Sequence, residues 1–174
     1  ILIALYDHVI DDSDAVIMAK CNCWTPQAVI LSEKRERLPD SLEYGLDVAV
    51  DRKQRNQSGR VYVIVDTGRT RDGIFWESLL RGHRSKLDNL TVIVDRNSVD
   101  DTISDIALSK VAMYAGWAAI IIDGHHVDTV RNTLDWTLTL SVPSLIIANT
   151  VSGRGVSFME DDSSWHARFP TPDE

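Results

Sequence analysis

The amino-acid sequence predicts an α/β fold: a doubly wound, mostly parallel sheet with helices on both faces. From residue 61 onward, short runs rich in Val and Ile alternate with longer amphipathic segments. Two of these runs, 117–122 and 145–147, are apolar without alternation, which is typical of parallel strands covered on both sides. The chain has 174 residues, 44% of them hydrophobic, enough for one domain with a sizeable core. We expect residues 1–174 to form a single domain that is incomplete at its N-terminus.

The N-terminal part is predicted to contain three helices and one strand. The patterns place a helix over residues 1–10, a short strand over 15–18, a helix over 26–31 and a helix from Ser41 to about Asn56. Pro26 suits the first turn of a helix, and Ser41 is a good N-cap. Residues 32–40 alternate in charge and end in a proline-containing turn, so we expect a solvated connection there. In the last of these helices, Tyr44, Leu46 and Val48 are expected to face inward.

The remaining elements follow in strict alternation. The pattern predicts strands over residues 61–65, 90–94, 117–122 and 144–148, with helices over 74–85, 103–114 and 126–140 between them. Ligands of such sheets bind beyond the carboxyl ends of the strands. Polar and glycine residues follow each strand at that edge: Thr67 and Gly68, Asn97, residues 123–125, and residues 150–155.

Composition limits the classes of partner and compartment. Lys and Arg number 18 against 26 Asp and Glu, a formal charge of −8, which argues against nucleic acid or an anionic membrane as a general partner. Cys21 and Cys23 are one residue apart, too close for an unstrained disulfide and too few for a structural zinc site. We therefore expect free thiols in a reducing compartment and a cytoplasmic protein. The longest apolar stretch is far shorter than the ~20 residues of a membrane helix.

Residues 61–73 form the most informative segment of the chain. A β-branched run stops at Gly68, passes through a polar turn to Gly73, and continues as a helix. Free backbone N–H groups at a helix start, with glycine allowing close approach, bind phosphate. Asn97 ends the next strand, and its amide oxygen suits a hard cation. The segment lacks the Lys and Ser/Thr of a P-loop, and no GxGxxG opens a helix.

These residues resemble the thiamine diphosphate motif of the transketolase family, which opens with Gly-Asp-Gly and closes with Asn about thirty residues later. Residues 87–97, 122–125, 146–160 and 165–166 also follow the family's diphosphate-binding domain in order. The resemblance covers nearly the whole chain. It is closest to the N-terminal subunit of the split type of transketolase, in which this half is a separate polypeptide.

The resemblance implies an activity and a site. A transketolase moves a two-carbon ketol unit between sugars with thiamine diphosphate and Mg²⁺. By resemblance, the Gly68 N–H and the helix start would hold the diphosphate, Asn97 and the Val99 carbonyl would hold Mg²⁺, and His166 would lie near the thiazolium and the substrate. The activating Glu and the aminopyrimidine pocket belong to the other half, so the implied partner is a C-terminal transketolase-like subunit in a dimer or heterotetramer.

The chain departs from the family at the cofactor. Thr67 stands at the position of the metal-binding Asp, Asn22 at that of one His, and Glu43-Tyr44 replaces Gly-His. A Thr67 hydroxyl would then be the remaining ligand at that metal position. Arg69 and Arg71 in the turn either pair with the diphosphate through their guanidinium groups or lie in solvent.

Two interpretations follow from these departures. In the first, the chain is the diphosphate-binding subunit of a working enzyme with an altered metal site. In the second, it is a catalytically degenerate subunit, a pseudoenzyme with a structural or regulatory role in a complex.

Overall fold

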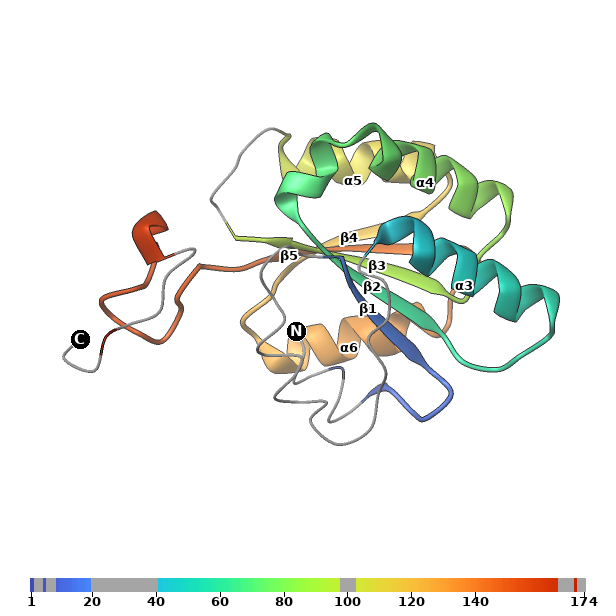
Figure 1. The fold of residues 1–174 in the computed structure, drawn as a ribbon, viewed down its shortest axis with the longest axis horizontal. Helices are drawn as coiled ribbons and strands as arrows, with labels where there is room; N and C mark the ends of the chain where they lie inside the picture. The colour runs from blue at the N-terminus through green and yellow to red at the C-terminus, as the bar shows by residue number, and fades with distance from the viewer. Residues whose placement is uncertain (2–4, 6–8, 20–40, 98–102, 166–170, 172–174) are drawn as a thin grey trace.

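The fold is a five-stranded, fully parallel sheet covered by helices on both faces (Figure 1). The computed structural model describes residues 1, 5, 9–19, 41–97, 103–165 and 171. The strands are β1 (Ala15–Ala19), β2 (Val61–Asp66), β3 (Leu90–Arg96), β4 (Ala118–Asp123) and β5 (Ser144–Asn149). Their order across the sheet is β1-β2-β3-β5-β4. The predicted α/β class and parallel sheet are confirmed.

Helices α3 (Leu42–Gln54), α4 (Gly73–Arg84) and α5 (Asp105–Tyr114) cover one face, and α6 (Val127–Thr137) covers the other (Figure 1). The order of the strands explains this division. The connections from β1 to β4 all advance in one direction across the sheet, whereas the connection from β4 to β5 returns. Because crossover connections are right-handed, reversing the direction moves the helix to the opposite face.

All five strands end one or two residues later than the sequence predicted. Strands β2 and β3 continue to Asp66 and Arg96 because the parallel register extends through these polar residues, with Asp66 opposite Asp95 and Arg96 opposite Asn149. Strand β4 begins at Ala118, whereas the sequence predicted that Trp117 would be its first residue. The Trp117 ring is buried, and Nε1 donates to the Leu79 carbonyl at 2.6 Å.

Each face of the sheet has its own apolar core. The cluster under α3, α4 and α5 takes the odd-numbered residues of β2, including Val61, Val63 and Val65. The cluster under α6 takes Tyr62 and Ile64. This alternation is the expected consequence of side chains pointing to opposite faces along a strand.

The inner face of α3 is built from small and aliphatic residues. Leu42, Gly45, Leu46 and Ala49 are buried, at the i, i+3, i+4, i+7 spacing of one helical face. The prediction that Leu46 faces inward is confirmed. Tyr44 and Val48 flank this stripe and are only partly buried against the core.

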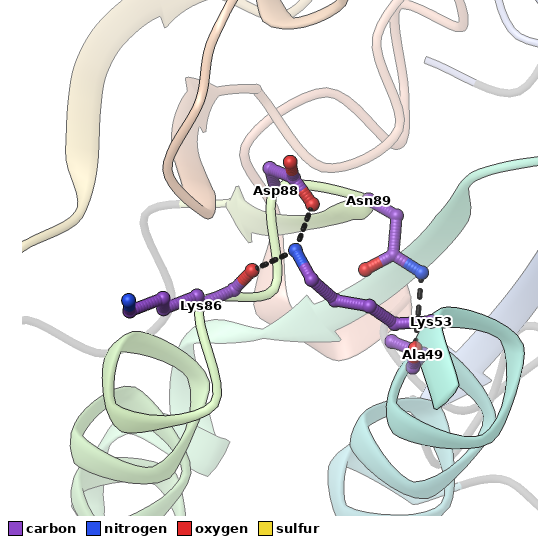
Figure 2. Close-up of polar contacts among 5 residues, drawn as sticks. All are labelled: Ala49, Lys53, Lys86, Asp88 and Asn89. Carbon is purple, nitrogen blue, oxygen red and sulfur yellow. Dashed lines mark hydrogen bonds and ion pairs between the residues drawn. The ribbon is translucent and has the colours of Figure 1, made fainter. Parts of the chain in front are cut away.

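The C-terminal end of α3 is tied to the turn between α4 and β3 (Figure 2). Lys53 Nζ donates to the carbonyl of Lys86 and to Asp88 Oδ1, and Asn89 Nδ2 donates to the Ala49 carbonyl at 3.0 Å. Lys86 adopts a φ of 52°, and its carbonyl is satisfied by the lysine ammonium. These contacts fix α3 and α4 at the amino ends of the strands, opposite the carboxyl ends where the sequence predicts the site.

Several predictions lie outside the described residues. These are the helix over 26–31, the connection over 32–40, most of the helix over 1–10, and residues Cys21, Asn22 and Cys23. Within the described part of the chain, no helix is long and apolar enough to cross a membrane.

Candidate functional site at the carboxyl edge of the sheet

The strand register brings the predicted site residues to one edge. Asp66 of β2 lies opposite Asp95 of β3, and Asn149 of β5 lies between Arg96 and Asp123. The carboxyl ends of β2, β3, β5 and β4, where the chain leaves the sheet, therefore lie side by side. This is where the sequence placed Thr67, Gly68, Asn97 and the turns after β4 and β5.

The exit of β2 is a short 3-10 helix, η2 (Thr67–Arg71), where the sequence predicted a polar turn. The cause is local capping: the Asp66 carboxylate accepts the Arg69 N–H at 3.1 Å, and the Thr70 hydroxyl donates to the Thr67 carbonyl at 2.7 Å. Gly68 is exposed, and a Cβ there would lie 3.2 Å from Asp66 Oδ1. The turn therefore already contains a carboxylate at its N-terminal end.

Thr67 is turned into the sheet. It is only 2% exposed, and its hydroxyl donates to the Asp95 carbonyl at 3.2 Å. The hydrogen of the hydroxyl is thus engaged, and the oxygen lone pairs are what a cation would use. Because the residue is buried, a cation would reach that oxygen only if the covering groups moved.

The start of α4 has the features of an anion site. Asp72 is the N-cap residue but makes no capping hydrogen bond with its side chain, and no acidic residue occupies the first turn. Its carboxylate instead lies 3.4 Å from Arg69 Nη1. First-turn N–H groups and the helix dipole at such a terminus favour a negative charge.

At the exit of β3, an ion pair between a buried arginine and a partly buried aspartate ties the strand to α5. Arg96 is 8% exposed, and its Nε lies 2.6 Å from Asp105 Oδ1 in the first turn of α5. Asn97 follows directly and is partly buried. Val99 lies outside the described residues, as does His166.

Asp95 joins three strand ends, a role that sequence reasoning missed. Its carbonyl accepts the Thr67 hydroxyl, and its Oδ1 accepts the Thr150 hydroxyl at 2.6 Å. The Thr150 N–H also donates to the Arg96 carbonyl at 2.8 Å. Polar residues at successive strand ends were visible in the sequence, but the pairing of β3 with β5 was not.

Glu43 and Tyr44 lie in the first turn of α3, and both are partly exposed. Among the described residues, no group of three or more His, Cys, Asp or Glu side chains is placed to hold a metal ion. A metal at this edge would therefore depend on amide, hydroxyl and carbonyl oxygens and on a bound ligand.

Comparisons with known proteins identify the family. The chain is 31% identical over 144 residues to one of the subunits of apulose-4-phosphate transketolase from Actinobacillus succinogenes, covering 77% of this chain and 52% of that protein. It is 34% identical over 121 residues to human transketolase, covering 66% of this chain and 19% of that protein. The chain belongs to the transketolase family. The predicted resemblance is thus confirmed, although no family model matches the chain.

Solved structures agree on the fold. A putative thiamin diphosphate-dependent enzyme from Mycobacterium smegmatis superposes with a TM-score of 0.68 at 15% identity, covering 84% of this chain and 30% of that one. Transketolase from Campylobacter jejuni gives 0.58 at 23% identity, covering 68% and 20%. The chain spans about half the length of the apulose-4-phosphate transketolase subunits that it matches, 51% and 52%. The transketolase-family sheet described above is therefore one part of a larger polypeptide in those relatives.

Proposed function

We propose that this chain supplies the diphosphate-binding part of a transketolase-like enzyme that transfers a two-carbon ketol unit between sugars or sugar-like substrates. It would act with a C-terminal transketolase-like subunit that provides the pyrimidine-binding half, in a dimer or heterotetramer. Family membership and the similarity to proteins named as single subunits of a transketolase support this proposal.

One observation carries the proposal: the exits of β2 and β3 are adjacent. Strands β2 and β3 pair through Asp66 and Asp95, so the turn with Gly68 and the residue Asn97 leave the sheet side by side. Backbone N–H groups that could bind a phosphate and an amide oxygen about thirty residues later in the sequence thus lie at the same edge of the sheet. This is the arrangement that a diphosphate with an associated cation requires.

Several of the described residues support the binding of a diphosphate. The uncapped start of α4 offers N–H groups, Gly68 is exposed, and Arg69 provides a guanidinium 44% exposed beside it. When bound, thiamine diphosphate supplies the thiazolium carbon that carries the ketol unit. This chain's own residues would hold and orient the diphosphate, and His166 would face the substrate.

The described residues fit Mg²⁺ less completely. Asn97 offers an amide oxygen, but the Thr67 hydroxyl is neutral and buried. Mg²⁺ is normally held by carboxylates and phosphates, and it keeps an octahedral shell. We propose Asn97, the Val99 carbonyl and Thr67 as its ligands, with the diphosphate itself providing most of the negative charge.

The second interpretation, in which the chain is catalytically degenerate, also has support. The Asp66 carboxylate accepts an N–H of the turn, where it would repel a diphosphate, and Glu43 adds a second carboxylate in the first turn of α3. Like charges ~4 Å apart repel by about 4 kcal/mol at the effective dielectric near a protein surface. A degenerate chain of this kind would keep the fold and the partner interface without turning over substrate.

Calorimetry separates these possibilities. Thiamine diphosphate is titrated into the chain together with its partner half, with and without Mg²⁺. Saturable binding that requires Mg²⁺ is the expected result for the enzyme. Absence of binding, combined with binding by a variant carrying Thr67→Asp, Glu43→Gly and Tyr44→His, would establish the degenerate form instead.

A matched pair of arginine variants tests the diphosphate contact. Arg69→Ala should weaken binding about ten-fold or more, because it removes a charge-assisted hydrogen bond. Arg55→Ala is the control, since Arg55 is an exposed arginine that pairs locally, with Asp51 four residues earlier at 2.8 Å. Equal affinities for the two variants would remove Arg69 from the site.

A further inference from the structure

The ring of His125 is the acceptor for a backbone N–H in the segment that follows β5. The Val151 N–H donates to His125 Nε2 at 2.6 Å. A backbone amide can only donate, so this ring nitrogen carries no hydrogen, and the neutral ring has its hydrogen on Nδ1. The protonation state of His125 is thereby tied to the position of Val151.

The turn that carries His125 is held firmly on the sheet. The His125 N–H donates to Asp123 Oδ1 at 2.8 Å, and the Gly124 N–H donates to the Asn149 carbonyl at 2.7 Å. Gly124 is pressed against β5, since a Cβ there would lie 2.6 Å from Thr150 Cγ2. The turn therefore holds the His125 ring in place beside the Val151 N–H.

The segment of residues 151–165 is held together mainly by contacts within itself. The Asp161 N–H donates to the Ser152 carbonyl at 2.9 Å, Arg154 pairs with Glu160 at 2.8 Å, and the rings of Phe158 and Trp165 meet edge to face at 5.2 Å. The segment projects from the body of the molecule, orange to red in Figure 1. Its start is joined to the sheet through Thr150 and Val151.

We propose that His125 is a pH-dependent latch that holds the start of residues 151–165, at Val151, on the carboxyl edge of the sheet. Protonation places a hydrogen on Nε2, which then faces the Val151 N–H, so two donors oppose each other and the bond is lost. Histidine is the side chain that ordinarily changes charge between about pH 5 and 8. The latch is closed while the ring is neutral and open once the ring is protonated.

Thr150 stays bonded to the sheet when the hydrogen bond between Val151 and His125 is lost. Its N–H donates to the carbonyl of Arg96, a main-chain group that does not titrate, so the end of β5 stays in place when the latch opens. The charged groups on the described elements that meet at His125 are Asp123 and His126 on its own turn, Asp128, Arg131 and Asp135 on α6, Asp95 and Arg96 on β3, and Arg154, Glu160, Asp161 and Asp162 on the segment. Arg96 and Arg154 are each paired with a carboxylate, Asp105 and Glu160 respectively.

The latch does not depend on a cofactor or a substrate. Its consequence for catalysis does rest on the proposed function, because the segment leads directly to His166.

Amide hydrogen exchange measured by NMR tests the latch on the full chain. The protection factor of the Val151 amide, corrected for intrinsic exchange, is expected to fall about five-fold between about pH 8 and about pH 5.5. His125→Gln should keep the protection at both pH values, because its amide oxygen replaces Nε2 as an acceptor. His125→Ala should show low protection at both. Protection in the wild type that is unchanged between the two pH values would overturn the proposal.

The neighbouring histidine provides the control. His126 accepts the Thr129 N–H within its own helix, at 3.3 Å, and asparagine is a good N-cap, so His126→Asn removes a titrating ring and keeps the cap. This variant should retain the pH dependence of Val151. Loss of that dependence in His126→Asn but not in His125→Gln would also overturn the proposal. If His125→Ala fails to fold, the comparison of wild type with His125→Gln still decides it.

Discussion

Tyr62 shows how strongly a single buried side chain can respond to its environment. It lies on β2 beneath α6, is 0% exposed, and its hydroxyl has no hydrogen-bond partner in the part of the chain that the structure describes. Burial, followed by the nearby Asp14 carboxylate, raises the pKa of the Tyr62 phenol to about 12, although Arg60 acts in the opposite direction. The folded protein therefore keeps this phenol neutral over a pH range where the unfolded chain ionises it.

This shift predicts a loss of stability at high pH. The pKa of the Tyr62 phenol has its ordinary value of 10.0 in the unfolded chain but is about 12 in the folded one. Below about pH 10 the phenol is neutral in both states and the free energy of unfolding is unaffected. As pH rises from about 10 toward about 12, only the unfolded chain ionises, so the free energy of unfolding falls by at most roughly 2–3 kcal/mol. Urea unfolding across this range measures the effect as the difference between wild type and Tyr62→Phe.

Tyr62→Phe should also raise the free energy of unfolding at neutral pH by about 1 kcal/mol, because an unsatisfied buried hydroxyl is removed. Tyr114 is 91% exposed, so Tyr114→Phe is the control and should change neither quantity. A wild-type profile that runs parallel to that of Tyr62→Phe from pH 10 to 12 would contradict the assignment.

At the scale of elements, α3 packs on the sheet through a glycine. A Cβ at Gly45 would lie 2.3 Å from Val63 Cγ2, so the helix approaches β2 more closely than alanine allows. Gly45→Ala should lower the free energy of unfolding by roughly 1–3 kcal/mol, although alanine is the better helix former by about 1 kcal/mol. Gly73→Ala at the start of α4 is the control, since a Cβ there meets nothing within 4 Å, and it should be neutral or stabilising. Thermal denaturation measures both variants.

The ion pair between β3 and α5 is a second element-scale contact. Asp105→Asn should cost roughly 2–4 kcal/mol, because Arg96 is buried and would lose its counter-charge. Asp128 is the matched control: it also lies in the first turn of its helix and pairs with Arg131, but at 3.9 Å and with its side chain 70% exposed. Asp128→Asn should cost less than about 1 kcal/mol by chemical denaturation. Similar costs for the two variants would show that burial does not strengthen the first pair.

At the scale of the whole molecule, the chain is predicted to need a partner. Two relatives are named as one subunit of an apulose-4-phosphate transketolase, and the proposed activity requires a pyrimidine-binding half. Mixed with a C-terminal transketolase subunit, the chain should elute from size exclusion as a heteromer of two or four chains, with mass measured by light scattering. Elution of the two proteins at their separate masses would refute the proposed partnership.

Much of the fold could be predicted because its signals are local. The β-branched runs, the helical spacing of apolar residues and the Ser41 N-cap, which accepts the Tyr44 N–H at 3.1 Å, are all properties of neighbouring residues. The parallel class followed from uniformly apolar strands. The same locality explains why strand ends were placed one or two residues short: register with a neighbouring strand, not sequence, carried β2 to Asp66 and β3 to Arg96.

The sequence by itself determined the family, the order of strands and helices along the chain, and the edge at which the candidate site residues gather. The tertiary structure decided how those residues are used. Thr67 and Thr150 meet Asp95 across separations of 28 and 55 residues, and Val151 meets His125 across 26. Such contacts depend on which strands become neighbours in the sheet, and the insertion of β5 between β3 and β4 leaves no trace in any local pattern.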